Sequence, residues 1–188
     1  MSGHLPLIPQ NLASRIKLVI FDVDGVLTDA GIYVGTTQEG QTIELKRFNL
    51  QDNVGMKMLG WETLDVAIVS GRVSAATAIR AEELGIECYQ EPDAYKLPAV
   101  EGILSRKGIA WDEVAMLADD IPDLAVLRKV GLPAAVANAT KPVRDIAVWK
   151  SEKTGGNGAV REFTDALLHA RGTLGKVIEQ YVADRSRS

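Results

Sequence analysis

The chain of 188 residues has little of several features that would point to a particular class of protein. It contains one cysteine, Cys88, so no disulfide can form within the chain, which is typical of a reducing compartment. A net charge of −4 gives no electrostatic reason to bind nucleic acid or an anionic membrane surface. No apolar run approaches the roughly 20 residues of a membrane-spanning helix. We therefore expect no nucleic-acid or membrane partner, and a cytoplasmic location.

The first 15 residues also lack the basic start and long apolar core of a signal peptide, and we interpret residues 1–15 as a polar leader. Cys88 lies in “GIECYQ”, among residues typical of a strand, which favours a packed small side chain over a nucleophile. The 46% of apolar and 24% of charged residues are typical of an ordinary globular protein. The length suits one domain, which we place at residues 16–172, with a tail at 173–188.

Short apolar runs alternate with segments of helical period along this domain. Runs typical of buried strands lie at residues 16–21, 64–70, 86–90, 113–118 and 132–137. Segments typical of helices lie at residues 53–60, 74–84, 96–107, 121–130 and 159–170. This succession predicts a doubly wound (Rossmann-like) α/β fold with a parallel sheet, in which ligands bind beyond the carboxyl ends of the strands. From residue 173 onward the chain either forms a terminal helix or stays mobile.

One segment, at about residues 31–48, interrupts the alternation. Its two β-rich pieces, residues 32–34 and 42–48, flank a polar turn and predict an inserted β-hairpin. An isolated hairpin is marginally stable in water, and this one carries the apolar residues Ile43, Leu45 and Phe48. We expect it to pack against another subunit; the alternative is a hairpin folded back on its own domain.

Aspartates follow two of the predicted strands. Asp22 and Asp24 come directly after the first strand in “FDVDGVLTD”, and Asp119, Asp120 and Asp123 follow a later one in “ADDIPD”. A lone DxDG could be a simple turn, because Asp readily bonds its own backbone. Several carboxylates that meet at one edge of a sheet, however, would repel one another without a cation. The pattern therefore predicts a Mg²⁺ site.

A metal ion beside an aspartate favours phosphoryl chemistry, because a carboxylate can accept the phosphoryl group while the cation neutralises its oxygens. Two further residues could contact those oxygens. Ser70, in “IVSGR”, lies at a strand-to-helix turn, and Lys96, in “DAYKLPAV”, begins a later helix. Each signal is weak alone, but their order after successive strands is specific.

In this order, the four groups of residues resemble the four motifs of the haloacid dehalogenase-type phosphatase superfamily. The stretches “GIYVG”, “FNLQDNVGMKML”, “IVSGR” and “GGNGAVREF” further resemble the 3-deoxy-D-manno-octulosonate 8-phosphate (Kdo-8-phosphate) phosphatases. Similar residues occur in the related nonulosonate 9-phosphate phosphatases, which therefore stay an alternative. The resemblance covers residues 16–172.

The resemblance implies Mg²⁺-dependent hydrolysis of a phosphorylated acidic sugar through an aspartyl-phosphate. Asp22 would attack phosphorus, and Asp24 would act as general acid and then as general base. Mg²⁺ would be held by the Asp22 carboxylate, the backbone carbonyl of Asp24 and Asp119. Asp120 or Asp123 would lie close by.

The resemblance also implies residues that bind the substrate. Ser70 and Lys96 would hold the phosphoryl oxygens. Gly71 and Arg72, with Arg161 of the glycine-rich segment, would contact the acidic sugar, because a guanidinium suits a carboxylate through paired hydrogen bonds.

Members of this family lack a large cap domain and assemble as homotetramers through their hairpins, so the resemblance implies a site covered by a neighbouring subunit. One residue departs from the family pattern. Ala118 stands where glycine usually precedes the fourth-motif aspartates, which raises the hypothesis of a lowered Mg²⁺ affinity.

Two other classes of protein stay open as alternatives. A receiver-like signalling domain also uses aspartates, Mg²⁺, a hydroxyl and a lysine in a parallel α/β fold, although it would carry its phosphoacceptor on a later strand. A catalytically silent assembly module would keep the fold without turnover. The complete set Asp22, Asp24, Ser70, Lys96 and Asp119 argues against the silent module.

Overall fold

The computed structural model describes residues 6–186. Residues 1–5 of the expected leader and residues 187–188 of the expected tail lie outside that range. The strands are β1 (Leu18–Phe21), β2 (Tyr33–Thr36), β3 (Thr42–Leu45), β4 (Asp65–Ser70), β5 (Glu87–Gln90), β6 (Val114–Ala118), β7 (Leu132–Ala135) and β8 (Trp149–Lys150). The helices are α1 (Gln10–Ala13), α2 (Leu50–Trp61), α3 (Ala75–Leu84), α4 (Lys96–Lys107), α5 (Leu124–Leu127), α6 (Lys141–Ile146), α7 (Ala159–Ala170) and α8 (Leu174–Arg185).

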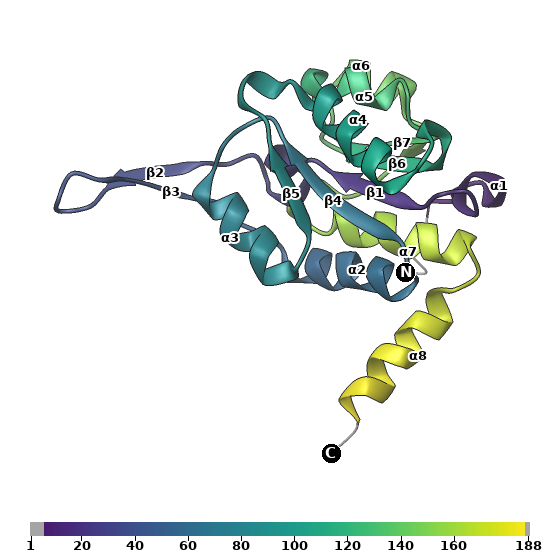
Figure 1. The fold of residues 1–188 in the computed structure, drawn as a ribbon. Helices are drawn as coiled ribbons and strands as arrows, with labels where there is room; N and C mark the ends of the chain where they lie inside the picture. Colours follow the sequence, from purple (N-terminus) through teal and green to yellow (C-terminus); the bar gives the residue numbers. More distant parts are fainter. Residues whose placement is uncertain (1–5, 187–188) are drawn as a thin grey trace.

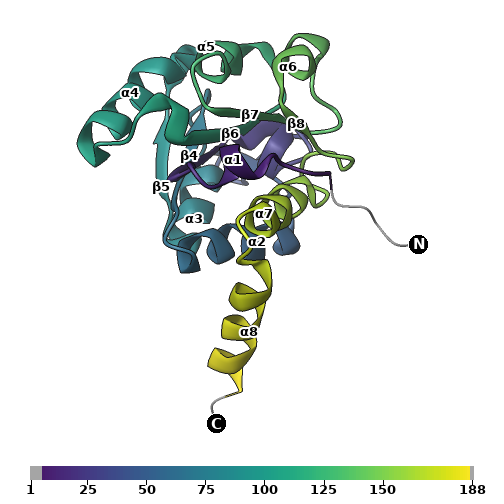
Figure 2. The ribbon, with the colours of Figure 1, turned by 90° about the vertical axis from the view of Figure 1, so that its right-hand side faces the viewer.

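Six strands form one sheet of order β5-β4-β1-β6-β7-β8, in which every neighbouring pair is parallel. Helices α4, α5 and α6 cover one face, and α2, α3 and α7 cover the other (Figures 1 and 2). The predicted doubly wound α/β architecture is confirmed. The chain runs from β1 outward to β4 and β5 and then crosses to β6, on the other side of β1. Such a reversal places the binding crevice at the carboxyl ends of the central strands.

The apolar runs of the sequence form the centre of this sheet. All four residues of β1 and all five of β6 are buried, as expected for parallel strands covered on both faces. The same core cluster takes in Ile8 and Ala13 from the expected leader and Val177 from α8, so packing extends beyond residues 16–172 on both sides.

Some boundaries differ from the prediction for local reasons. Helix α2 begins at Leu50 rather than at residue 53, because the Asn49 side chain caps it by accepting a hydrogen bond from the Gln51 N–H at 2.8 Å. The predicted helix at 121–130 is wrong in extent. Residues Ile121–Asp123 form a single 3₁₀ turn that contains Pro122, and the α-helix that follows ends at Leu127.

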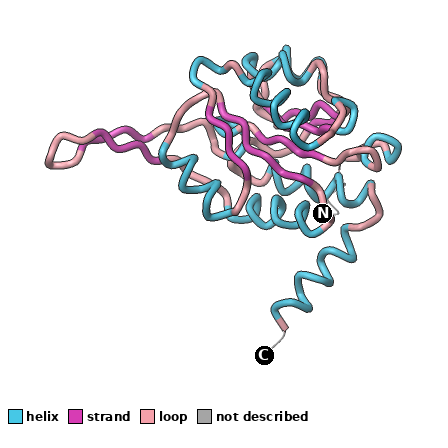
Figure 3. Tube along the Cα trace, viewed as in Figure 1, coloured by secondary structure: helices cyan, strands magenta, loops and turns pink. Residues whose placement is uncertain are grey.

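The hairpin formed by β2 and β3 extends away from the rest of the domain (Figure 3). Tyr33, Val34 and Leu45 are exposed on it. Phe48 corrects the prediction: it forms an antiparallel bridge with Thr28 and packs against the core of its own domain. The base of the hairpin is therefore fixed to the domain, while the apolar side chains along its two strands remain exposed.

The segment after residue 173 forms a helix, α8, which projects from the domain (Figures 1 and 2). Its inner side holds the buried Val177, and Tyr181 stacks on Trp61 of α2 with ring centroids 5.1 Å apart. Cys88 lies in β5 and packs against the core, where burial raises the pKa of its thiol. Within residues 6–186, none of the helices is long and apolar enough to cross a membrane.

Candidate active site

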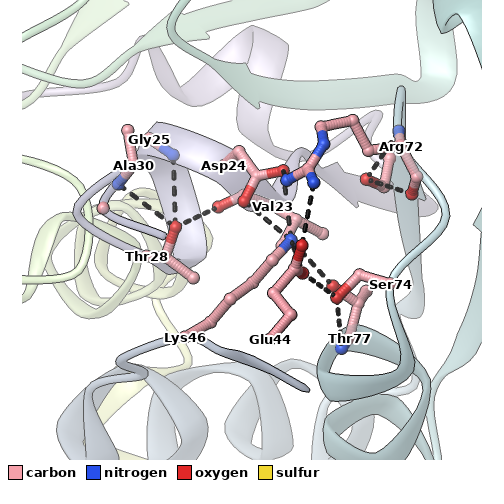
Figure 4. A network of polar contacts seen from close by, with 12 residues as sticks. Val23, Asp24, Gly25, Thr28, Ala30, Glu44, Lys46, Arg72, Ser74 and Thr77 are labelled. Atoms are coloured by element: carbon pink, nitrogen blue, oxygen red, sulfur yellow. Dashed lines mark hydrogen bonds and ion pairs between the residues drawn. The ribbon is translucent and has the colours of Figure 1, made fainter. Parts of the chain in front are cut away.

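The carboxyl end of β1 passes into a tight turn that Gly25 makes possible. Gly25 has a φ of +95°, and a Cβ at this position would lie 2.0 Å from Asp119 Oδ2, so a side chain here would displace that carboxylate. The Thr28 hydroxyl braces the turn: it accepts from the Gly25 N–H at 3.4 Å and donates to the Val23 carbonyl at 3.2 Å (Figure 4). The turn therefore lies directly against the Asp119 carboxylate, at the end of the neighbouring strand β6.

The glycine-rich loop of the sequence supports this turn from behind. A Cβ on Gly155 would lie 1.7 Å from the Gly25 carbonyl oxygen, so the two backbones can touch only because Gly155 carries no side chain. Asn138 fixes the contact, because it accepts from the Gly155 N–H at 2.8 Å and donates to the Gly25 carbonyl at 3.4 Å. The motif “GGNG” thus acts on the site through the backbone.

Three carboxylates, from Asp22, Asp119 and Asp123, converge beyond β1 and β6, with oxygens within 4.8 Å of one another. The Lys96 ammonium, at the start of α4, donates to Asp22 Oδ1 at 2.5 Å and to Asp123 Oδ1 at 2.6 Å. Asp22, Lys96 and Asp123 are buried, so the charges are poorly screened. One ammonium faces three carboxylates.

The pKa values of the cluster residues reflect this excess of negative charge. Burial, together with the charges of Asp22, Asp123 and Asp120, raises the pKa of Asp119 to about 8. Burial and the charge of Asp22 raise the pKa of Asp123 to about 7. The pKa of Lys96 is also raised, since the attraction of Asp22 and Asp123 outweighs the burial that would lower it. A divalent cation would remove the repulsion, and oxygen ligands are those that Mg²⁺ prefers, so the residues fit that metal.

Asp123 joins this cluster directly, whereas the Asp24 side chain faces elsewhere. The Asp24 carboxylate forms ion pairs with Lys46, at 2.8 Å, and with Arg72, at 3.5 Å (Figure 4). Because the Asp24 side chain is directed at these cations, only its backbone carbonyl is left for the predicted contact with the metal, as the family resemblance implies.

Ala118 ends β6 in register with Ala135 of β7, and its side chain is fully buried. The position has ordinary strand geometry, which alanine adopts without strain. Asp119 still reaches the carboxylate cluster. The structure thus offers no backbone reason for a lowered Mg²⁺ affinity.

A cavity of about 360 Å³ opens over this edge of the sheet. Its lining residues are Asp22, Asp24, Ala30, Gly71, Arg72, Ala94, Lys96, Asp119, Asp120, Pro122 and Asp123. Most of the site residues predicted from the sequence are therefore brought together. Ser70 ends β4 next to β1, and its buried hydroxyl exchanges hydrogen bonds with the backbone of Arg72, at 3.1 and 3.2 Å. It supports the turn that presents Gly71 and Arg72 to the cavity.

Arg161 is not among the residues that line the cavity in the described part of the chain. It lies in the first turn of α7, where its side chain pairs with Asp165 at 2.8 Å. Its backbone N–H donates to the buried carboxylate of Asp52 at 2.8 Å. In this structure Arg161 joins α2 to α7.

Two hairpin residues that were not predicted from the sequence, Glu44 and Lys46, also reach the site. Lys46 contacts Asp24, and Glu44 Oε2 accepts from Arg72 at 2.8 Å. Their spacing of two residues in a predicted strand was a usable signal, since it places both on one face. Nothing in the sequence alone says that this face meets Asp24.

The parallel sheet, the aspartate pair after β1, the lysine at the start of α4 and the acidic group after β6 define a hydrolase of the haloacid dehalogenase (HAD) superfamily. The solved structure of a HAD superfamily (subfamily III A) hydrolase from Legionella pneumophila matches with a TM-score of 0.84 and 38% identity, covering 93% of both chains.

More specific relatives share most of the chain. The 3-deoxy-D-manno-octulosonate 8-phosphate phosphatase KdsC of Escherichia coli (strain K12) is 40% identical over 162 residues, which are 86% of this chain and 84% of KdsC. The phosphatase of the same name from Moraxella catarrhalis, solved with a magnesium ion, a phosphate ion and KDO, matches with a TM-score of 0.83 and 36% identity, covering 92% of this chain and 97% of that one. No family model matches the chain. The chain belongs to the family of 3-deoxy-D-manno-octulosonate 8-phosphate phosphatases.

Proposed function

We propose that this protein hydrolyses the phosphate monoester of 3-deoxy-D-manno-octulosonate 8-phosphate to 3-deoxy-D-manno-octulosonate and inorganic phosphate. The observation that carries the proposal is the buried cluster of Asp22, Asp119, Asp123 and Lys96 beside a separately paired Asp24. It supplies a nucleophile, a cation site and an acid–base group at one end of the sheet, in a chain 40% identical to KdsC.

Asp22 is the proposed nucleophile. Its carboxylate attacks phosphorus as the bond from phosphorus to the sugar oxygen breaks, which leaves an aspartyl-phosphate. Asp24 gives a proton to the departing sugar oxygen and later takes one from the attacking water, whose oxygen displaces Asp22 and releases phosphate. Lys96 orients Asp22 through its 2.5 Å contact and lies near the transferred oxygens. Ser70 is proposed as a second contact to those oxygens.

Mg²⁺ is the proposed cofactor, held by the carboxylates of Asp22 and Asp119 and the backbone carbonyl of Asp24, with Asp123 next to them. When bound, it supplies positive charge that stabilises the phosphoryl oxygens in the transition state. The raised pKa values of Asp119 and Asp123 support this assignment, because they report repulsion that a cation would relieve.

Gly71 and Arg72 are proposed to bind the acidic part of the sugar. Gly71 packs closely against Ala94, since a Cβ on Gly71 would lie 2.9 Å from the Ala94 Cβ. Arg72 lines the cavity, and its side chain is 45% exposed. Arg161 stays a proposed substrate contact. Because it does not line the cavity described here, this contact requires either a different position of α7 or the Arg161 of a second subunit.

The proposed assembly is a homotetramer joined through the hairpin. The exposed Tyr33, Val34, Ile43 and Leu45 support it, because an isolated hairpin gains little stability from its own burial. Light scattering of the native protein and of the Ile43→Ser/Leu45→Ser variant tests this proposal. We expect a tetramer that dissociates in the variant, and a native monomer would contradict it.

The test of the activity is phosphate release with Mg²⁺ from 3-deoxy-D-manno-octulosonate 8-phosphate and, side by side, from nonulosonate 9-phosphates. A higher kcat/KM for the eight-carbon substrate, lost on chelation of the metal, supports the proposal. A preference for the nine-carbon substrates would favour the alternative phosphatase. A stable phospho-aspartate without turnover would indicate a receiver-like module, and the absence of both would indicate a silent one.

A further inference from the structure

Strand β3 presents two chemically different faces. Ile43 and Leu45 are 43% and 60% exposed. Glu44 and the next residue of that face, Lys46, point the other way, as alternation along a strand requires. The Lys46 side chain is fully buried, although lysine ammonium groups are rarely buried without a charged partner. The hairpin thus carries charge into the domain.

The partner of Lys46 is Asp24. Its ammonium lies 2.8 Å from Asp24 Oδ1 and donates a hydrogen bond to Oδ2 at 3.1 Å (Figure 4). The Oδ1 contact is an ion pair without hydrogen-bond geometry, and Oδ1 is a buried atom that accepts no hydrogen bond from the described residues. Lys46 therefore holds the Asp24 side chain in one orientation through both of its oxygens.

Helix α3 fixes Lys46 and Glu44 in turn. Lys46 also donates to the Thr77 hydroxyl at 3.3 Å. Glu44 Oε1 accepts from the hydroxyl of Ser74, the residue that caps α3, at 2.6 Å, and Glu44 Oε2 accepts from Arg72 at 2.8 Å. Both hairpin side chains are thereby held by helix α3 and its N-cap residue, which belong to the parallel-sheet domain.

We propose that Lys46 is a positioning residue for Asp24: the hairpin places a buried ammonium that orients the Asp24 carboxyl group, which gives its proton to the departing sugar oxygen and becomes a carboxylate. This inference rests on the proposed function. Glu44 contributes by holding Arg72 beside the same carboxylate. The hairpin then has two roles, since one face of β3 completes the site while the other is free to meet a second subunit.

The effect of Lys46 depends on the leaving group. A sugar alkoxide is a poor leaving group and needs the proton from Asp24, whereas a nitrophenolate leaves without one. The constant kcat/KM reports the steps up to formation of the aspartyl-phosphate. A misplaced Asp24 should therefore lower kcat/KM for the sugar phosphate and spare kcat/KM for p-nitrophenyl phosphate.

The experiment compares Lys46→Met with the native protein on both substrates, with Mg²⁺ present. We expect kcat/KM for 3-deoxy-D-manno-octulosonate 8-phosphate to fall by about 10²-fold, the scale of a displaced catalytic group. For p-nitrophenyl phosphate we expect a change within about threefold, since its leaving group needs no proton. The matched control is Lys141→Met, which removes another Lys–Asp pair, to Asp145 at 2.7 Å, whose lysine is 85% exposed. This control should change neither constant.

If Lys46 has a purely structural role, Lys46→Met should lower kcat/KM for both substrates together or for neither. Either outcome would overturn the proposal. Thr77→Val covers the case in which Lys46→Met fails to fold: it removes one contact of the ammonium and should shift the ratio of the two constants in the same direction, by a smaller factor. Mg²⁺ binding measured by calorimetry should persist in both variants. If the native protein released phosphate from neither substrate, the proposed function itself would fail, and this inference with it.

Discussion

Two charged clusters lie at the same edge of the sheet, and they differ in balance. Around Asp22, three carboxylates face the single ammonium of Lys96. Around Asp24, two carboxylates face two cations, since Glu44, Lys46 and Arg72 complete the group. The first cluster has excess negative charge in a buried place, and the second is close to neutral.

This difference indicates what each cluster can do. Excess buried charge is unfavourable unless a proton or a cation arrives, so the Asp22 cluster is suited to bind a metal ion. A balanced network gains nothing from a metal, but its fixed partners orient a side chain. Two aspartates one residue apart, Asp22 and Asp24, are thereby assigned to different chemistry by their neighbours.

The largest expected effect comes from removing the proposed nucleophile. Asp22→Asn should lower phosphate release from either substrate by more than roughly 10⁴-fold, because no aspartyl-phosphate can form. Asp24→Asn should instead spare phosphoryl transfer from p-nitrophenyl phosphate, which a burst of nitrophenolate would record. If Asp24→Asn lowered phosphoryl transfer from both substrates as much as Asp22→Asn does, the two clusters would not have separate roles.

The next effect concerns Mg²⁺ and pH. The pKa values of Asp119 and Asp123, about 8 and about 7, lie above their ordinary value of 3.8. Folding is therefore favoured by the bound protons at low pH, and without metal this contribution to stability is lost as pH rises through 7 to 8. Mg²⁺ can replace those protons.

We expect the gain in Tm with Mg²⁺ to increase between pH 6 and pH 9, and thermal denaturation with and without chelator measures it. At a Mg²⁺ concentration about 100 times Kd the gain corresponds to about 2.7 kcal/mol. Asp119→Asn, which removes the carboxylate with the more strongly raised pKa, should flatten the pH dependence. If the gain in Tm with Mg²⁺ stayed constant between pH 6 and pH 9, the excess of negative charge around Asp22 would be contradicted.

A smaller effect is expected at Arg72, in the balanced cluster. Arg72→Met should raise KM for the acidic sugar phosphate by about 10- to 100-fold, the value of a hydrogen bond between charged groups, and leave KM for p-nitrophenyl phosphate nearly unchanged. Arg106→Met is the control. Arg106 forms an ion pair with Glu87 much as Arg72 does with Glu44, and the two arginine side chains are similarly exposed. An equal rise for both substrates would place Arg72 on the phosphate instead.

The smallest effect is expected at Ala118. Because this residue has ordinary strand geometry, Ala118→Gly should change the Mg²⁺ activation constant by less than about twofold and cost about 0.5–1 kcal/mol of stability. Magnesium titration of activity and urea denaturation measure the two quantities. A several-fold tighter activation constant in the variant would revive the hypothesis of a weakened metal site.

Much of the carboxylate cluster could be predicted because Asp22 and Asp119 follow strands directly. Asp22 and Asp119 are each the first residue after a buried strand, and parallel strands deliver their carboxyl ends to one edge. Lys96 was predictable for a different reason, since it begins the helix that follows β5. The hairpin network was less accessible, because Lys46 reaches Thr77 and Asp24 across 31 and 22 positions of the chain.

By itself, the sequence determined the fold class and the position of the acidic residues, since continuous apolar runs can be buried only as inner strands and each aspartate group closes such a run. Only the tertiary structure decided which charges meet. It joined Asp123 to Asp22 and Asp119, turned Asp24 toward Lys46, and placed Arg161 against Asp52 and Asp165. The physical reason is that the strength of a charge interaction depends on distance and burial, and both arise only when the hairpin, the turn at Gly25 and the helices pack together.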